Sequence, residues 1–207
     1  MAYLNGDEIN SVVIEHDLKE RPNWDDLFLG LGKEKTDILN SLSALAYANG
    51  PGSYTALRSA ASFLKGLAYS QQLPIIPISS LESQAWEGKH WIKHLPAKIG
   101  SALDADGQGY YFNIYDVGFE SIKRLQEDAI ITLDELKSYA KDEDDCYFIG
   151  DVWEQCSISE AKRLMNATSS AESVASIAKM RLDSGMTFQL DEIDPVYLKD
   201  LEFKKIT

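Results

Sequence analysis

Cysteine, histidine and long apolar runs are all scarce in this sequence, and each scarcity excludes a class of protein. The two cysteines, Cys146 and Cys156, have no histidine beside them, and their spacing fits neither a zinc knuckle nor a redox pair, so free thiols are expected. No apolar stretch approaches the roughly 20 residues that cross a bilayer, and residues 1–10 have neither the basic start nor the apolar segment of a signal peptide. The sequence therefore predicts a cytoplasmic protein without membrane segments.

Basic side chains are also few, compared with acidic ones. The chain has 20 Lys and Arg residues against 33 Asp and Glu residues, which gives a net charge of -13. An acidic surface repels phosphate backbones, so nucleic-acid binding by this chain alone is disfavoured. The deficit is uneven, because residues 101–160 carry four basic and 15 acidic side chains whereas residues 51–100 carry five basic and two acidic ones. With 207 residues, of which 44% are hydrophobic, the chain can form one large domain or two small ones.

The first part of the chain has the pattern of an α/β protein. Asn5-Gly6 stands between two short apolar runs and predicts an antiparallel hairpin. Helical spacing follows over residues 24–31, and residues 42–48 and 73–78 are predicted strands on either side of a long helix. A helix between two strands is a βαβ unit, so these two strands should be parallel.

A second set of elements begins after Pro96. Two strands joined by a polar Asp-Gly turn are predicted at residues 99–103 and 110–115, and Thr132 with Glu135 forms a capping box that opens a helix. A strand at residues 147–150 and helices over residues 159–165 and 171–182 complete the pattern. We therefore expect two α/β halves, residues 1–96 and 97–207, and the C-terminal tail is a segment that could pack back on the first half.

The stretch over residues 49–71 joins a tight turn to the most apolar helix in the chain. Its small and apolar residues leave little of the helix surface polar, so we expect the helix to be covered on more than one side. Backbone N–H groups converge where it begins, which makes the turn a candidate site for an anion or a nucleotide. The alternative is that the glycines only permit the turn. The turn consists of Gly50, Pro51, Gly52 and Ser53, and Ser53 is placed to cap the helix.

Three stretches of this sequence are specific enough to compare with a known family, and they read GPGSYTALRSAASFLKGLA, LPIIPISSLESQA and DPVYLK; a fourth, SALDADGQGYYFNIYD, is a looser match. In these stretches the sequence resembles the TsaB family, the non-catalytic partners of TsaD in bacterial synthesis of N6-threonylcarbamoyladenosine at position 37 of tRNA. The resemblance implies the actin-like ATPase fold, with two ribonuclease-H-like halves and mixed sheets. In TsaD, two histidines four residues apart bind the catalytic metal, and Ser80 and Gln84 stand at those positions here. Neither side chain is a useful transition-metal ligand, so no metal, cofactor or catalytic residue is expected.

The resemblance also implies a scaffold subunit that binds a TsaD-like catalytic subunit through its first two helices. A TsaE-like ATPase would join through the complex, and a homodimer through the same face is an alternative when the partner is absent. The residues expected at this interface are Trp24, Leu27, Phe28, Leu31, Leu57, Arg58, Ala61, Leu64 and Lys65.

Two other functions stay open. One is a nucleotide-binding regulator that uses the Gly-Pro-Gly turn, and the other is a metal-dependent, glycoprotease-like hydrolase. His90 and His94 have the spacing of two ligands on one helical face, but they come ten residues late and have no carboxylate ligand nearby, so a metal is not expected there.

The N-terminus departs from the family pattern. Family members begin with a central strand and only then reach a hairpin like residues 2–14. We therefore expect either about ten residues upstream of Met1 or another segment in the place of that strand, because a vacant central position leaves pairing and core unfilled. Direct pairing of residues 2–4 with residues 44–48 would argue against this.

Overall fold

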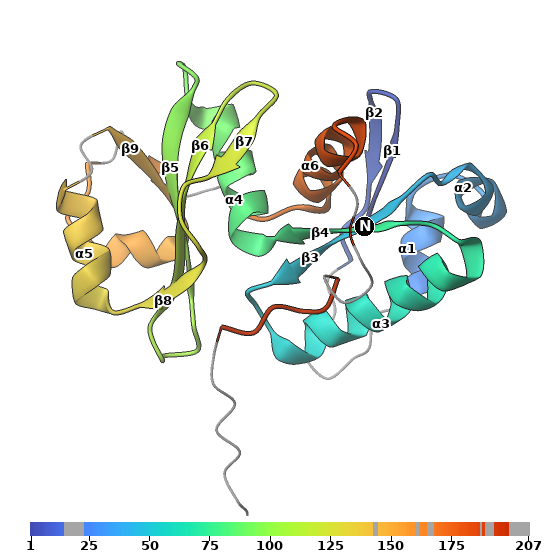
Figure 1. The fold of residues 1–207 in the computed structure, drawn as a ribbon, viewed down its shortest axis with the longest axis horizontal. Coiled ribbons are helices and arrows are strands. Elements are labelled where there is room, and N and C mark those ends of the chain that lie inside the picture. The colour runs from blue at the N-terminus through green and yellow to red at the C-terminus, as the bar shows by residue number, and fades with distance from the viewer. Residues whose placement is uncertain are drawn as a thin grey trace, which may run out of the picture.

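The computed structural model describes residues 1–14, 23–142, 145–159, 162–164, 168–186, 188 and 193–198 of the chain. Its elements form two groups that lie side by side (Figure 1). One group contains the N-terminal strands and helices together with the last helix, and the other is built on a larger sheet.

The N-terminal group begins with the predicted hairpin. Strands β1 (Ala2–Asn5) and β2 (Glu8–Ser11) pair antiparallel around Gly6, whose φ of 62° suits a tight turn. Strands β3 (Leu45–Gly50) and β4 (Ile75–Ser79) flank helix α3 (Tyr54–Gln71) and pair in parallel, which confirms the βαβ prediction. Two shorter helices, α1 (Trp24–Gly30) and α2 (Lys35–Ser41), lie between the hairpin and β3 in the sequence.

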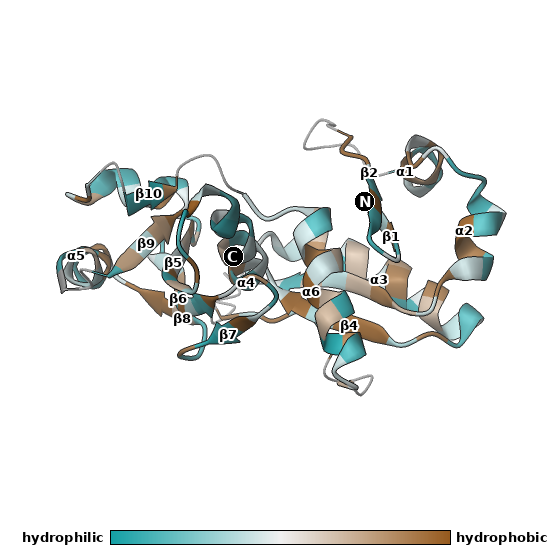
Figure 2. Ribbon diagram, turned by 90° about the horizontal axis from the view of Figure 1, so that it is seen from above, coloured by the Kyte–Doolittle hydropathy of each residue, from teal (hydrophilic) through white to brown (hydrophobic). Residues whose placement is uncertain are grey.

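The two small sheets of this group are separate. Over the described ranges, β1 pairs with β2 alone and β3 pairs with β4 alone. The last helix, α6 (Ala171–Asp183), packs against all four strands and therefore holds the two sheets in one layer. Apolar stretches run along α3 and β4 (Figure 2), as expected for elements covered by neighbours.

The second group is a six-stranded mixed sheet. Its order is β10-β9-β5-β6-β7, and β8 also pairs with β6. The strands are β5 (Ala97–Asp104), β6 (Tyr110–Val117), β7 (Ile122–Arg124), β8 (Ala129–Ile131), β9 (Cys146–Ile149) and β10 (Arg163–Leu164). Helix α5 (Leu133–Asp142) opens with the predicted capping box, in which the Glu135 carboxylate accepts from the Thr132 backbone N–H at 2.8 Å.

One predicted element of this sheet is wrong. Residues 159–165 were expected to be helical, but Arg163 and Leu164 form β10, parallel to Phe148 and Ile149. Leu164 is buried against the apolar core there, so burial on the sheet outweighs the local helical pattern. The short strands β7 and β8 had no sequence signal strong enough to predict them.

Helix α4 (Ser80–Gly88) joins the two groups. It contacts β3, β4, β5 and β6, and its Leu81 and Ala85 are fully buried. The largest apolar cluster therefore runs from Ile76 and Ile78 of β4 to Ile99 of the second sheet. Two short 3-10 helices, Lys89–Trp91 and Asp151–Gln155, follow α4 and β9. Among the helices described, none combines the length and the apolar character needed to cross a bilayer.

Candidate functional site

The segment 193–198 runs alongside α3 (Figure 1), where Asp194, Pro195 and Tyr197 lie next to residues of that helix. The backbone N–H of Val196 donates to the Asn49 carbonyl at 2.8 Å, which fixes the segment to the end of β3. Ile193 is buried in the core beneath α3, and the Tyr47 hydroxyl donates to its carbonyl oxygen. Burial and the nearby Asp194 raise the pKa of Tyr47 to about 12, so this donor keeps its proton at physiological pH.

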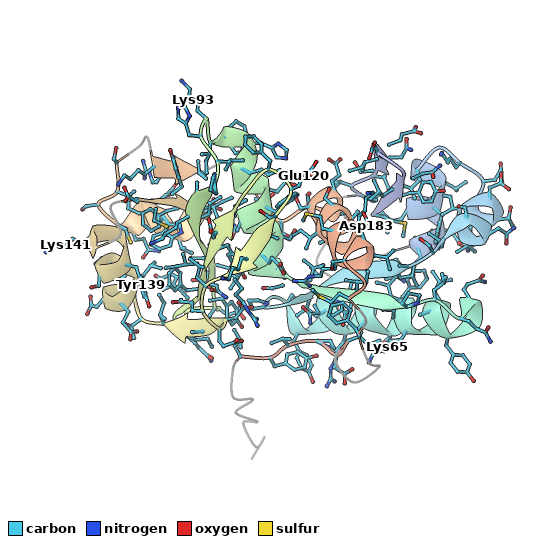
Figure 3. The ribbon with its side chains drawn as sticks, turned by 45° about the horizontal axis from the view of Figure 1, so that its top comes forward. Lys65, Lys93, Glu120, Tyr139, Lys141 and Asp183 are labelled. Atoms are coloured by element: carbon cyan, nitrogen blue, oxygen red, sulfur yellow. The ribbon has the colours of Figure 1, made fainter. Side chains whose placement is uncertain are left out.

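Two predicted interface residues contact this segment directly. The Arg58 guanidinium lies 4.2 Å from the ring centroid of Tyr54 and 5.9 Å from that of Tyr197, and its Nε donates to the Tyr197 hydroxyl at 3.2 Å. Lys65, which projects from α3 in Figure 3, forms an ion pair with Asp194. The cationic side of α3 is thus partly engaged by the chain's own tail, although the Arg58 side chain stays exposed.

The Gly-Pro-Gly turn is shaped by the same tail. Gly50 has a φ of 120°, and a Cβ there would lie 2.7 Å from the Val196 carbonyl oxygen, so the close approach of the tail requires glycine. Ser53 occupies the N-cap position of α3, but its side chain makes no capping hydrogen bond, and that prediction is wrong. Anion binding at Gly50, Pro51, Gly52 and Ser53 stays a prediction.

Five of the other predicted interface residues line an apolar groove between β1 and β3. The groove has a volume of about 620 Å³. The Trp24 ring stacks on Phe63 with centroids 4.1 Å apart, so α1 and α3 meet along one wall. Phe28 and Leu31 are each only 5% exposed, whereas Trp24 and Leu27 are half-buried. The predicted residues at the groove are Trp24, Leu27, Phe28, Leu31 and Leu64, while Leu57 and Ala61 are buried elsewhere under α3.

The positions of the implied metal ligands are inside the core. Ser80 and Gln84 are buried on α4, and the Gln84 amide oxygen accepts from the Ser101 hydroxyl at 2.6 Å. Helix α4 ends at Gly88, so His90 and His94 do not share a helical face, and both are exposed. In the part of the chain that the structure describes, no three His, Cys, Asp or Glu residues gather into a group that could hold a metal ion.

Sequence reasoning missed a buried polar cluster where the two groups meet. Glu82 of α4 forms an ion pair with Arg181 of α6, in which one guanidinium nitrogen lies 2.7 Å from both carboxylate oxygens. Beside it, the Asp128 carboxylate accepts from Ser79 at 2.8 Å and from the Asn113 amide. Only the charge of Glu82 within an otherwise buried helix could have signalled this cluster, because Asp128 and Arg181 lie far along the chain.

Comparison with known proteins identifies relatives of this chain in sequence. A family model described as "TsaD: tRNA N6-adenosine threonylcarbamoyltransferase" matches residues 33–195. Two curated proteins named "tRNA threonylcarbamoyladenosine biosynthesis protein TsaB" are similar in sequence. The one from Haemophilus influenzae is 27% identical over 81% of this chain and 75% of its own length, and the one from Escherichia coli is 26% identical over 93% and 84%.

Solved structures agree in fold. The structure titled "YeaZ from Pseudomonas aeruginosa" superposes with a TM-score of 0.72 at 21% identity, covering 95% of this chain and 92% of that one. A second structure from the same organism, titled as an uncharacterized protein with similarity to peptidase YEAZ, gives a TM-score of 0.69 at 22% identity over 85% and 81%. The chain thus belongs to the family that the matching model describes, and within it to the TsaB family.

Proposed function

We propose that this protein is a non-catalytic subunit in the synthesis of N6-threonylcarbamoyladenosine in tRNA, and that it binds and supports a TsaD-like catalytic subunit in the cytoplasm. The family match over residues 33–195 supports a part in the synthesis of this modified nucleoside. The observation that carries the non-catalytic role is the state of Ser80 and Gln84, which are buried in the core and, in the case of Gln84, already bonded to Ser101. Neither a serine nor a glutamine side chain is a useful transition-metal ligand, and this supports the proposed non-catalytic role.

The proposed docking surface is the outer side of α1 and α3 together with the tail over residues 193–198. Of the predicted interface residues, Arg58 is the most prominent, because its exposed guanidinium is held between Tyr54 and Tyr197. Preorganised arginine and tyrosine side chains are common energetic centres of protein interfaces. Phe28, Leu57 and other buried members of the predicted set would act by supporting this surface rather than by touching the partner.

Two further features belong to the same proposal. The two element groups would correspond to two actin-like halves, residues 1–96 and 97–207, with α6 and the tail returning to the first. A TsaE-like ATPase would join the complex by binding the TsaD-like subunit. Without that partner, two copies of the chain would form a homodimer through the side of α1 and α3, because apolar side chains on that surface are more stable when a second protein shields them from water.

The test is direct binding to the TsaD-like protein of the same organism. We expect the purified chain to form a complex with it, and Arg58→Ala to weaken that complex at least tenfold in a titration. Arg124→Ala is the matched control, since Arg124 is an exposed arginine on β7 whose ion pair with Glu127 is also exposed. Absence of a complex, or peptide or ATP turnover by the purified chain alone, would count against the proposal.

A further inference from the structure

A pocket between α3 and the segment 193–198 has a charge opposite in sign to that of the whole chain. Its charged lining residues are Arg58 and Lys65 of α3 and Asp194 of the tail, so two cations face one carboxylate. Helix α3 itself carries no Asp or Glu over Tyr54–Gln71. The chain has a net charge of -13. The pocket is therefore a locally cationic site on an acidic protein.

The Arg58 side chain is fixed but not used up by its neighbours. Its guanidinium lies 4.2 Å from the ring centroid of Tyr54, and its Nε donates to the Tyr197 hydroxyl at 3.2 Å. Within the described ranges, the terminal nitrogens Nη1 and Nη2 have no hydrogen-bond acceptor. These two nitrogens form the fork that binds both oxygens of a carboxylate. Because the side chain is already held in place, it loses little conformational entropy when it binds one.

The pocket already holds one carboxylate, at the end away from Arg58. The Asp194 carboxylate forms an ion pair with Lys65, which projects from α3 in Figure 3. Lys65 follows Arg58 by seven residues, so the two cations lie on the same side of the helix, about 10 Å apart along its axis. The lysine end is thus neutralised by the chain's own tail, whereas the arginine end keeps its positive charge.

We propose that Arg58 binds the carboxylate of an Asp or Glu side chain on the TsaD-like subunit. This inference rests on the proposed function and names the chemistry of one contact within it. RNA fits the pocket less well, because the net charge of -13 repels a polyanion and one unneutralised cation can pair with few phosphates. A single carboxylate on a protein surface needs only local charge complementarity.

Titration of the TsaD-like protein of the same organism with charge variants of this chain tests the proposal. Arg58→Gln removes the charge but keeps a polar side chain, and should raise the Kd by about tenfold or more. Arg58→Lys keeps the charge but loses the fork, and should raise the Kd by a smaller factor. Arg124→Gln is the matched control and should leave the Kd unchanged, because Arg124 is an exposed arginine on β7.

Asp194→Asn should have the opposite effect. The Asp194 carboxylate repels an incoming carboxylate, so its removal should lower the Kd by about two- to fivefold at low salt. The tail keeps its other anchors in this variant, since Val196 donates to the Asn49 carbonyl and Ile193 is buried. A merely structural role of Asp194 in holding the tail would raise the Kd instead.

Coupling with a carbodiimide identifies the group that contacts position 58, because this reagent joins an amine to a carboxylate only where the two touch. In the complex formed by Arg58→Lys, the amine at position 58 should couple to an Asp or Glu of the partner, as detected by mass spectrometry after digestion. The matched variant Arg124→Lys should give no coupling to the partner.

The possible results separate this inference from the function on which it rests. A complex whose Kd is unchanged by Arg58→Gln, or raised by Asp194→Asn, would overturn the inference and leave the proposed function standing. So would coupling of position 58 within its own chain alone. Binding of tRNA by the unmodified chain that Arg58→Gln abolishes would assign the site to phosphate and overturn the inference as well. Absence of any complex with the unmodified chain would overturn both.

Discussion

The ion pair between Glu82 and Arg181 gives the sharpest prediction for stability. The Glu82 side chain is 7% exposed and that of Arg181 is 23% exposed. Arg181 also donates to the Pro77 carbonyl at 2.6 Å, so it bonds both α4 and β4 from its place on α6. Removing one partner of a buried pair leaves an uncompensated charge, and we expect Arg181→Met to lower the free energy of unfolding by about 3–5 kcal/mol. For a chain of this size, that corresponds to a fall in Tm of about 6–20 °C.

The pH dependence of this loss tests its cause. Burial raises the pKa of Glu82, and Arg181 opposes that rise, so removing Arg181 should raise the pKa further. A carboxyl whose folded pKa exceeds its unfolded pKa contributes stability at low pH and loses it as the pH rises through the folded value. The deficit of Arg181→Met should therefore shrink as the pH falls from 8 to 5 in chemical denaturation.

The control for this prediction is Lys179→Met, which removes an exposed ion pair with Asp183 on the same helix and should leave the free energy of unfolding nearly unchanged, because solvent screens exposed pairs. A deficit below about 1 kcal/mol for Arg181→Met, or one that is equal at pH 8 and pH 5, would refute the reasoning.

Three further predictions concern single side chains. Gly150→Ala should destabilise the protein by about 3 kcal/mol or more in thermal unfolding, because Gly150 has a φ of 118° and its Cβ would overlap the Ala102 carbonyl oxygen; a soluble variant of unchanged Tm would contradict this. Tyr47→Phe should lower the free energy of unfolding by about 1–3 kcal/mol at pH 7, because it removes the hydrogen bond to the Ile193 carbonyl. In urea denaturation, the wild type should lose stability as the pH rises from 10 through the Tyr47 pKa of about 12, and this loss should be absent from Tyr47→Phe. Burial raises the pKa of the Cys156 thiol, so Ellman's reagent at pH 8 should modify it more slowly in the folded protein than in urea, and equal rates would count against the burial.

Local signals in the sequence predicted local structure well. Asn5-Gly6 fixed the first hairpin, and Thr132 with Glu135 fixed the start of α5, because each depends on residues within a few positions. The sequence predicted that α3 is covered on more than one side and that the tail could pack back on the first half. It did not predict that Arg58 and Lys65 would contact that tail, which lies more than 120 residues further along the chain. Residues 193–198 have no hydrophobic periodicity that could predict this contact, because a short extended segment on a helix needs no repeating pattern of apolar residues.

The same limit applies to the candidate site. The family resemblance drew attention to Ser80 and Gln84, but the hydrogen bond from Ser101 to Gln84 could not be predicted from the sequence. The expected helical face for His90 and His94 was wrong because α4 stops at Gly88. That glycine packs near Leu164 and Ile99, a contact between distant parts of the chain that no local pattern encodes.

The position of α6 at the end of the sequence has a consequence for synthesis on the ribosome. Strands β3 and β4 are complete by residue 79, but α6, which covers one face of them, ends only at Asp183. At about 5–20 residues per second, that face stays uncovered for roughly 5–20 s after β4 has been made. During this interval the nascent chain exposes Ile76 and Ile78, both nearly inaccessible in the finished protein. We expect trigger-factor-type chaperones to engage the chain in this window, and a chain stopped before residue 171 to aggregate rather than to yield a folded N-terminal half.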